Sequence, residues 1–263
     1  MSTETLDLSL VLACYNDAEY LDHSVEEIFK VLDMTKLSYE IIFVHDCGTD
    51  DTLSVIDMIM SKYRNAKRMK KIAHAGNEGR GKSVRDGFGI AEGRIVGYID
   101  VDLDVHPRYI PSMAAAILTD GYDVATAFRY YRMSFSPLFI LRHMLSHGYR
   151  FLSRALLHEA LKDSESGYKF FKRDRIMPLA GMSRYDGWFW DTEIMCYSIY
   201  SGLKIKEVPC VFDRRDDKKS SVRVFRTIMD YFRNLIEFKI YLVKNKERFF
   251  GAARRQRAAG GRS

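Results

Sequence analysis

Three aspartates alternate with apolar residues in the segment DVDLD, at Asp100, Asp102 and Asp104. The apolar run RIVGYI before them predicts a buried strand that ends at this cluster. In extended backbone, residues i, i+2 and i+4 point to one side, so we expect the three carboxylates to converge. Such carboxylates repel one another unless a cation lies between them, and oxygen ligands suit Mg²⁺ or Mn²⁺. The segment predicts a metal site that stabilises a diphosphate leaving group, rather than an acidic surface turn.

A second segment, GNEGRGKS from Gly76 to Ser83, fits the phosphate-loop pattern G-x-x-x-x-G-K-[ST] at every fixed position. In such loops, backbone N–H groups surround the phosphates and the Lys reaches the outer ones. However, the strand expected before it, KRMKKIAHA, is short and basic, and only one short helix separates Ser83 from the strand ending at Asp100. We therefore interpret the segment as a tight turn and helix start in which Lys82 faces solvent. A P-loop NTPase remains a remote alternative.

Composition narrows the function classes. The chain has 263 residues, 47% of them hydrophobic, which suits a globular enzyme with one sizeable core. The net charge is +6, and Lys and Arg are concentrated between residues 204 and 262, which fits a solvated surface, an anionic membrane surface or an anionic substrate. The basic residues do not interleave with aromatic residues on a recognisable module, which argues against nucleic-acid binding.

Cysteine spacing and hydropathy indicate the compartment. Cys14, Cys47, Cys196 and Cys210 form no C-x-x-C pair, which disfavours a zinc site or a disulfide framework and favours a reducing compartment. The polar start MSTETLDLS predicts no signal peptide, and no apolar run approaches the roughly 20 residues that span a bilayer. The run 136–157 is interrupted by Arg and His and predicts an amphipathic helix. We expect a cytoplasmic protein that contacts a membrane peripherally.

The elements that must position these side chains alternate between strand and helix. Strands are predicted at 8–15, 39–46, 67–75 and 94–102, with helices at 17–35, 50–63 and 83–93 between them. This order is typical of an α/β protein with a parallel sheet and helices on both faces. Ligands of such sheets bind at the carboxyl ends of the strands. The polar residues at those ends are Tyr15, Asn16, Asp17, Asp46, Asn77, Asp100 and Asp102.

The second half of the chain continues less regularly. Helices are predicted at 107–118, 137–158, 191–202 and 221–245, and strands at 123–129, 166–174 and 204–212. We predict one domain over residues 1–220, a helix over 221–248 that packs on the domain or on a membrane surface, and a disordered basic tail over 249–263.

Seven segments, in order along residues 8–222, resemble the motifs of family 2 glycosyltransferases of the GT-A fold. They are LVLACYNDAEYL, EIIFVHDCGTDDT, GNEGRGKSVRDGF, DVDLD, DVATAFR, DSESGYKFF and VPCVFDRRDDKKSS. Within the family, the chain is most similar to the dolichol- and polyprenol-phosphate mannose synthase group. Ala13 replaces a Pro, Asp17 a Glu, His45 an Asp and Cys47 a Gly of the family pattern, and the departures at Ala13, His45 and Cys47 lie around the expected nucleotide pocket. Donor identity is therefore left open.

The resemblance implies a fold and a set of site residues. The fold is a Rossmann-like, mostly parallel sheet flanked by helices, with a C-terminal amphipathic helix. The residues that it implies for donor binding are Ala13, Tyr15, Asp17, Asp46, Asn77, Arg85 and Asp100. The residues that it implies for metal binding are Asp102 and Asp104. Asp102, Arg129, Arg215 and Asp191 take catalytic positions, and Arg142 and Ser146 take acceptor positions. The arginines would gather the phosphates of donor and acceptor.

The implied reaction is an inverting, Mg²⁺- or Mn²⁺-dependent hexose transfer from a nucleotide-diphosphate sugar, such as GDP-mannose or UDP-glucose, to a polyprenyl phosphate. A phosphate acceptor is already an anion and needs no base, so Asp191 would orient the site. The segment WFWDTEIM offers Asp191 and Glu193, and with a saccharide or small-molecule hydroxyl as acceptor Asp191 would act as the base. The neighbouring Trp188, Phe189 and Trp190 could stack on a sugar or contact lipid, and core packing is the equal alternative.

Overall fold

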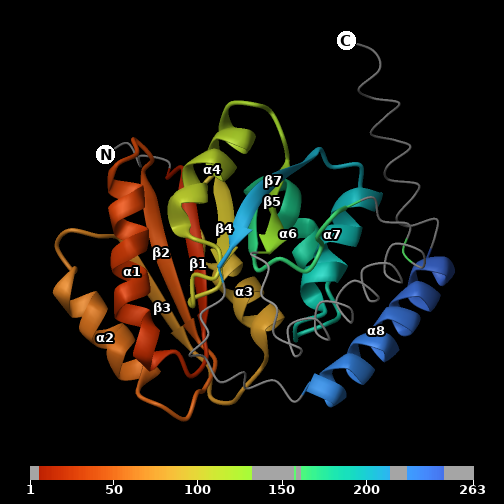
Figure 1. Cartoon of the computed structure of the whole chain (residues 1–263), viewed down its shortest axis with the longest axis horizontal. Helices are drawn as coiled ribbons and strands as arrows, with labels where there is room; N and C mark the ends of the chain where they lie inside the picture. The colour runs from red at the N-terminus through yellow and green to blue at the C-terminus, as the bar shows by residue number, and fades with distance from the viewer. Residues whose placement is uncertain (1–5, 132–156, 158–160, 214–223, 246–263) are drawn as a thin grey trace.

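A seven-stranded mixed sheet forms the centre of the protein (Figure 1). The structure, a computed structural model, describes residues 6–131, 157, 161–213 and 224–245. The strands are β1 (Leu8–Cys14), β2 (Tyr39–His45), β3 (Met69–Ala73), β4 (Ile95–Ile99), β5 (Val124–Tyr131), β6 (Tyr168–Lys172) and β7 (Ile205–Phe212). Their order across the sheet is β3-β2-β1-β4-β6-β5-β7.

Most neighbouring strands run parallel, as the sequence predicts. β1 pairs in parallel with β2 and β4, β2 pairs with β3, and β5 pairs with β7. The exception is β6, which runs antiparallel to both β4 and β5. The parallel strands therefore end at one edge of the sheet, and β6 brings its own start to that edge. The α/β fold of the sequence analysis is confirmed.

Helices cover both faces of the sheet (Figure 1). They are α1 (Ala18–Asp33), α2 (Thr52–Lys62), α3 (Arg80–Gly89), η1 (Pro107–Tyr109), α4 (Ile110–Leu118), α6 (Arg173–Ala180), α7 (Trp190–Tyr200) and α8 (Val224–Lys244). Alternate residues of β1 separate the two layers, because successive side chains of a strand point to opposite faces. Leu10 and Leu12 pack with α1, α2 and α4, whereas Val11 packs with α3, α6 and α7.

A third apolar cluster joins α8 to α7 beyond the sheet. Leu235, Phe238 and Leu242 of α8 pack against Phe189 and Tyr197. The predicted amphipathic character of this helix explains the contact, since these three residues lie on one helical face. Within the described part of the chain, no helix is both long enough and apolar enough to span a membrane.

Two helices differ from the sequence prediction. The helix expected at 83–93 begins at Arg80, three residues earlier. It begins there because Gly79, directly before it, adopts a φ of 98°, which residues other than glycine rarely tolerate. A β-carbon at Gly79 would also lie 2.6 Å from the carbonyl oxygen of Asp186. The second difference is α6, an eight-residue helix that the sequence analysis did not predict.

Candidate active site at the carboxyl ends of the strands

The acidic segment DVDLD is a turn and not an extension of β4. The strand ends at Ile99, the amide of Leu103 donates to the carbonyl of Asp100 at 3.2 Å, and Leu103 has a φ of 55°. The expectation that extended backbone would align three carboxylates is therefore wrong. Asp102 and Asp104 nevertheless lie close together, since the amide of Asp104 approaches Oδ1 of Asp102 at 3.4 Å.

Asp100 faces Arg80, which the sequence analysis did not include among the site residues. Nε of Arg80 donates to Oδ1 of Asp100 at 3.0 Å and Nη2 to the same oxygen at 2.5 Å, while Nη1 donates to Asp191 at 2.5 Å. Burial lowers the pKa of the Arg80 guanidinium, but Asp100 and Asp191 more than offset this, so its pKa lies well above the ordinary value. Arg80 therefore stays charged and joins the start of α3 to the turn after β4.

Asp191, at the start of α7, has donors on both oxygens. Oδ2 accepts from Arg80, and Oδ1 accepts from the Tyr98 hydroxyl and from Nζ of Lys169 at 3.1 Å. The Lys169 side chain is fully buried, and burial lowers its pKa despite the attraction of Asp191. Carboxylate charge also suits the N-terminal turn of a helix. This arrangement suits a carboxylate that orients neighbouring side chains, and it suits a general base less well.

Arg129 is the second arginine that meets a buried carboxylate. Its Nε donates to Asp163 at 2.6 Å and its Nη2 at 2.8 Å. Burial would raise the pKa of Asp163, but the charge and hydrogen bonds of Arg129 hold it below its usual range. Arg129 also lines one cavity together with Asp100, Asp104, Val105, Gly167, Tyr168 and Phe212. A β-carbon at Gly167 would overlap the Asp100 carboxylate, so a side chain at this position would displace Asp100 from its place beside Arg80.

The predicted nucleotide-side residues follow β1 and β2 at the same edge. Ala13 lies near the end of β1 and packs partly buried against the cluster of α3, and Tyr15 is 41% exposed. The backbone amide of Tyr15 donates to Asp17 at 2.8 Å. Asn16, with a φ of 56°, accepts from the amide of Thr49 at 2.7 Å. The two loops that follow β1 and β2 therefore brace each other.

Asp46 is engaged by the chain itself. Its two carboxylate oxygens accept from the amide of Glu78 at 2.8 Å and from that of Gly79 at 2.9 Å. Nδ1 of His74 lies 2.9 Å from the same carboxylate, and the Asn77 side-chain amide donates to the Asp46 carbonyl at 3.4 Å. The amides that would surround a phosphate in a P-loop thus hold an aspartate. Asp46 fixes where α3 begins.

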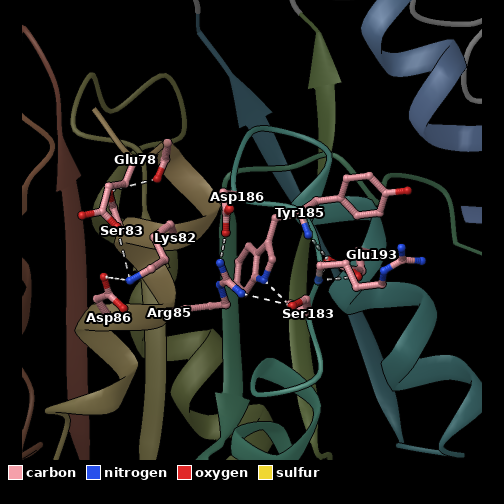
Figure 2. A network of polar contacts seen from close by, with 12 residues as sticks. Glu78, Lys82, Ser83, Arg85, Asp86, Ser183, Tyr185, Asp186 and Glu193 are labelled. Carbon is pink, nitrogen blue, oxygen red and sulfur yellow. Dashed lines mark hydrogen bonds and ion pairs between the residues drawn. The ribbon is translucent and has the colours of Figure 1, made fainter. Parts of the chain in front are cut away.

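The Lys of the phosphate-loop pattern is likewise paired within the chain (Figure 2). Lys82 forms ion pairs with Asp86, one turn further along α3, and, at 3.5 Å, with Glu78, which lies just before the helix. His74, Glu78 and Asp86 each present a ligand atom within 4.8 Å of the others. Lys82 supplies the positive charge at this cluster. The geometry argues against the P-loop alternative.

Arg85 points to the loop before α7. It pairs with Asp186 and donates to the carbonyl of Ser183 at 3.2 Å, as Figure 2 shows. The structure therefore places this predicted donor residue against residues 183–186 and not against Asp46 or Asp100. Its contacts fix the loop that leads into α7.

Glu193 holds the same loop from α7. Its carboxylate accepts from the amide of Arg184 at 3.0 Å, from that of Tyr185 at 3.2 Å and from the Tyr197 hydroxyl at 3.0 Å. Burial raises the pKa of Glu193 to about 6, although these hydrogen bonds favour the charged form. All three donors are structural, so Glu193 is committed to the loop and does not line the cavity beside Asp100.

The aromatic triplet before Asp191 divides into core and surface. Phe189 and Trp190 are buried, whereas Trp188 is 49% exposed and its ring lies 5.0 Å from the Arg80 guanidinium.

The structure thus unites Asp100, Asp104 and Arg129 around one cavity, and adds Arg80, Lys169, Tyr98 and Asp163 to the site. Of these four, Asp163 and Lys169 carried a sequence signal: Asp163 begins the motif segment DSESGYKFF, and Lys169 is a lone charge in the apolar strand YKFF. Arg142, Ser146, Arg215 and most of the predicted helix 137–158 lie outside the described residues.

Comparison with known proteins places this geometry in a family. The family model for glycosyl transferase family 2 matches residues 9–177. Glycosyltransferase AglD of Haloferax volcanii is 26% identical over 219 residues, which cover 81% of this chain and 34% of AglD. The dolichyl-phosphate beta-glucosyltransferase of Drosophila melanogaster is 25% identical over 227 residues, 82% of this chain and 69% of that protein. The chain spans about a third of the length of AglD.

Solved structures agree on the fold. Glucosyl-3-phosphoglycerate synthase from Mycobacterium tuberculosis, in complex with UDP, superposes with a TM-score of 0.66 at 19% identity, covering 89% of this chain and 80% of that one. The same enzyme in complex with Mn²⁺, UDP and glucosyl-3-phosphoglycerate gives a TM-score of 0.63, also at 19% identity, over 88% of this chain and 77% of that one. With the family model matching well over half of its length, this chain belongs to glycosyl transferase family 2.

Proposed function

We propose that this glycosyltransferase moves a hexose from a nucleotide-diphosphate sugar to a polyprenyl phosphate, with inversion at the anomeric carbon. The observation that carries the proposal is the cavity at the carboxyl ends of the strands, where Asp100, Asp104 and Arg129 meet. Such an edge is where open α/β sheets bind ligands. Relatives named dolichyl-phosphate beta-glucosyltransferase support the lipid acceptor, and the complexes of the fold neighbour with UDP-glucose and Mn²⁺ support the donor.

Asp102 and Asp104 would hold Mg²⁺ or Mn²⁺. They fit the ion because they lie on one turn and offer only oxygen atoms, and because Asp104 lines the cavity that Arg129 also lines. Magnesium sites commonly take one or two carboxylates and complete their coordination with phosphate and water. When bound, the ion would neutralise the charge that develops on the departing nucleotide diphosphate.

Arg129 would bring a positive charge to the phosphates in the same cavity, with its orientation set by Asp163. Arg215 is proposed to assist it, and Arg142 and Ser146 to contact the acceptor phosphate. The phosphate oxygen then attacks the anomeric carbon in line as the bond to the diphosphate breaks. Because this oxygen is already anionic, no base is required. The donor is held by Tyr15, Asp17, Asn77 and Asp100 in this proposal.

The contacts of Asp191 favour the phosphate acceptor over a hydroxyl acceptor. A general base needs an oxygen within reach of the substrate proton, and both Asp191 oxygens accept from Arg80, Tyr98 and Lys169. One observation supports the second candidate, transfer to a small-molecule hydroxyl. The fold neighbour is a glucosyl-3-phosphoglycerate synthase that has been solved in complex with phosphoglyceric acid.

We further propose that the protein associates with the cytoplasmic face of a membrane, and that residues 1–220 form the catalytic domain with 221–248 as a docking helix. Ile236, Ile240 and Val243 are exposed at spacings of four and three residues along the outer side of α8. Residues 246–263 add six Lys and Arg against one Glu. An apolar stripe next to positive charge is typical of helices that bind anionic lipid surfaces.

The test is a donor screen followed by a transfer assay. Thermal unfolding with MnCl₂ and UDP-glucose, GDP-mannose, UDP or GDP should reveal which nucleotide stabilises the protein, because a ligand of the folded state raises its melting temperature. The stabilising donor is then incubated with polyprenyl phosphate or with 3-phosphoglycerate. Transfer only to the lipid phosphate supports the proposal, and transfer only to the small molecule overturns it. Arg142→Ala should raise KM for the lipid while donor hydrolysis is unchanged.

A further inference from the structure

Trp188 is an exposed aromatic side chain that directly precedes the buried residues Phe189 and Trp190. Its neighbours Phe189 and Trp190 belong to the apolar core, whereas about half of the Trp188 side chain, 49%, is accessible to solvent. An exposed Trp costs solubility and contributes little to the core. A role in contacting a ligand explains why it is placed there.

One face of the Trp188 ring rests on Arg80. The guanidinium carbon of Arg80 lies 5.0 Å from the centre of the Trp188 ring and 5.2 Å from that of Tyr98. The edge of the guanidinium is occupied as well, by Asp100 and Asp191. With its side chain only 11% exposed, Arg80 orients Trp188 and is not itself available to a ligand.

The loop that carries Trp188 is anchored at several points. Asp186 accepts from Arg85 through its side chain and from the amide of Lys82 through its carbonyl at 3.0 Å. Glu193 accepts from the amides of Arg184 and Tyr185 (Figure 2). A side chain held in this way loses little conformational freedom when a ligand binds, which favours recognition.

We propose that the Trp188 indole is the surface on which the transferred hexose stacks, and that Arg80 is its positioning residue. The proposal rests on the proposed function. A pyranose ring has an apolar face of C–H groups and a rim of hydroxyls. The indole offers a flat apolar surface to the C–H face of the sugar. The Asp100 carboxylate, which contacts the same Arg80 guanidinium as the indole, offers a hydrogen-bond acceptor to the sugar hydroxyls. We call the Trp188 indole the sugar platform. Because this platform would contact the sugar and not the nucleotide, it should discriminate a nucleotide sugar from the free nucleotide.

The chain provides a specific reporter for this contact. It contains two Trp, and Trp190 is buried, so a Trp190→Phe variant has Trp188 as its sole indole. In this variant, UDP-glucose or GDP-mannose with MnCl₂ should change the emission of Trp188 more than UDP or GDP does. Equal changes with and without the sugar would contradict the contact.

Affinity measurements distinguish a failure of the proposed Trp188 platform from a failure of the proposed function. By calorimetry, Trp188→Leu should weaken the stabilising nucleotide sugar about five- to ten-fold and leave the matching nucleoside diphosphate unaffected, while Trp188→Phe keeps most of the affinity. If both ligands bind and Trp188→Leu weakens neither, or both equally, the platform is wrong and the proposed function stands. If no nucleotide or nucleotide sugar binds the unmodified protein, both are overturned.

The role of Arg80 has a readout without any ligand. Arg80→Lys retains the charge but loses the planar group beneath the indole. In the Trp190→Phe background, it should make Trp188 more accessible to acrylamide and reproduce the loss of nucleotide-sugar affinity. Lys82→Ala, on the same helix but paired with Asp86, is the matched control and should change neither. Unaltered quenching in Arg80→Lys would remove Arg80 from the proposal.

Discussion

Arg80 and Asp100 are bound to each other by two hydrogen bonds, from Nε at 3.0 Å and from Nη2 at 2.5 Å to the same carboxylate oxygen. The pair connects the first residue of α3 with the first residue after β4. Since Nη1 of Arg80 also reaches Asp191 at the start of α7, one guanidinium relates three elements at the edge of the sheet. The candidate site is organised around this buried cation as much as around its aspartates.

The acidic turn leads to the first prediction. Asp102→Asn should abolish the thermal stabilisation by a nucleotide diphosphate that depends on Mn²⁺, and reduce transfer about 100-fold or more, because a proposed metal ligand is lost. The measurement is thermal unfolding with and without MnCl₂. The control is Asp57→Asn, which changes an exposed carboxylate of α2 that pairs with Lys71 of β3. This variant should behave as wild type. Retained metal dependence in Asp102→Asn would refute the metal role.

Arg129 leads to a prediction about stability. Arg129→Met should lower the free energy of unfolding by about 3–5 kcal/mol at pH 7, because Asp163 is left buried without this partner. In the wild type the pKa of Asp163 is depressed, so its contribution is present above the usual carboxyl range and is lost as pH falls below it. In the variant, the carboxyl takes up a proton more readily. The defect should therefore shrink between pH 7 and pH 4.

Urea denaturation at several pH values measures this difference. The double variant Arg129→Met/Asp163→Leu should recover most of the loss, since replacing both members of a buried ion pair is far less costly than removing one. A single variant that is as stable as the wild type at pH 7 would contradict the importance of the pair.

Glu193 should make stability depend on pH in the opposite direction. Its pKa in the folded protein is about 6, above the ordinary value of 4.5, so it contributes stability at low pH that is lost as pH rises through 6. The wild type should lose about 2 kcal/mol relative to Glu193→Gln across that window. Unfolding of both proteins between pH 4.5 and 7 measures the difference. Parallel curves would show that Glu193 does not titrate there.

Lys82 tests the P-loop alternative. Lys82→Ala should change nucleotide affinity by no more than about two-fold, because the side chain pairs with Asp86 and Glu78 and its removal acts as a surface substitution. Calorimetric titration with the best nucleotide from the screen is the measurement. Complete loss of binding would restore the phosphate-loop interpretation.

The outer stripe of α8 gives a prediction about membranes. Under the proposed docking, Ile236→Glu/Ile240→Glu should reduce binding to vesicles that contain anionic lipid about ten-fold or more, because two exposed aliphatic side chains are replaced by charged ones. Co-sedimentation with the vesicles measures it. Met34→Glu, a change at an 81% exposed residue next to α1, is the control. Equal binding by both variants would argue against docking through α8.

Local patterns in the sequence are enough to predict most of the strands and helices in their order along the chain, and the edge at which the polar residues gather. Apolar periodicity and polar strand ends depend on neighbours a few residues away, so the sequence alone assigns Asp46, Asp100 and Asp104 to one edge of the sheet. The resemblance in seven ordered segments also identifies the family that the family model matches. The direction of β6 and the existence of α6 were not predicted.

Which of these side chains pair with one another depends on the folded chain. Asp46 holds the amides of Glu78 and Gly79, Arg85 turns to Asp186, and Arg80 connects Asp100 with Asp191. Each partner lies on a different element, so no local pattern encodes the contact, and the outcome depends on which charges burial brings within reach. For the same reason, the segment GNEGRGKS matches the phosphate-loop pattern but does not form a phosphate loop. Asp46, directly after β2, accepts from the amides of Glu78 and Gly79 that a phosphate would need.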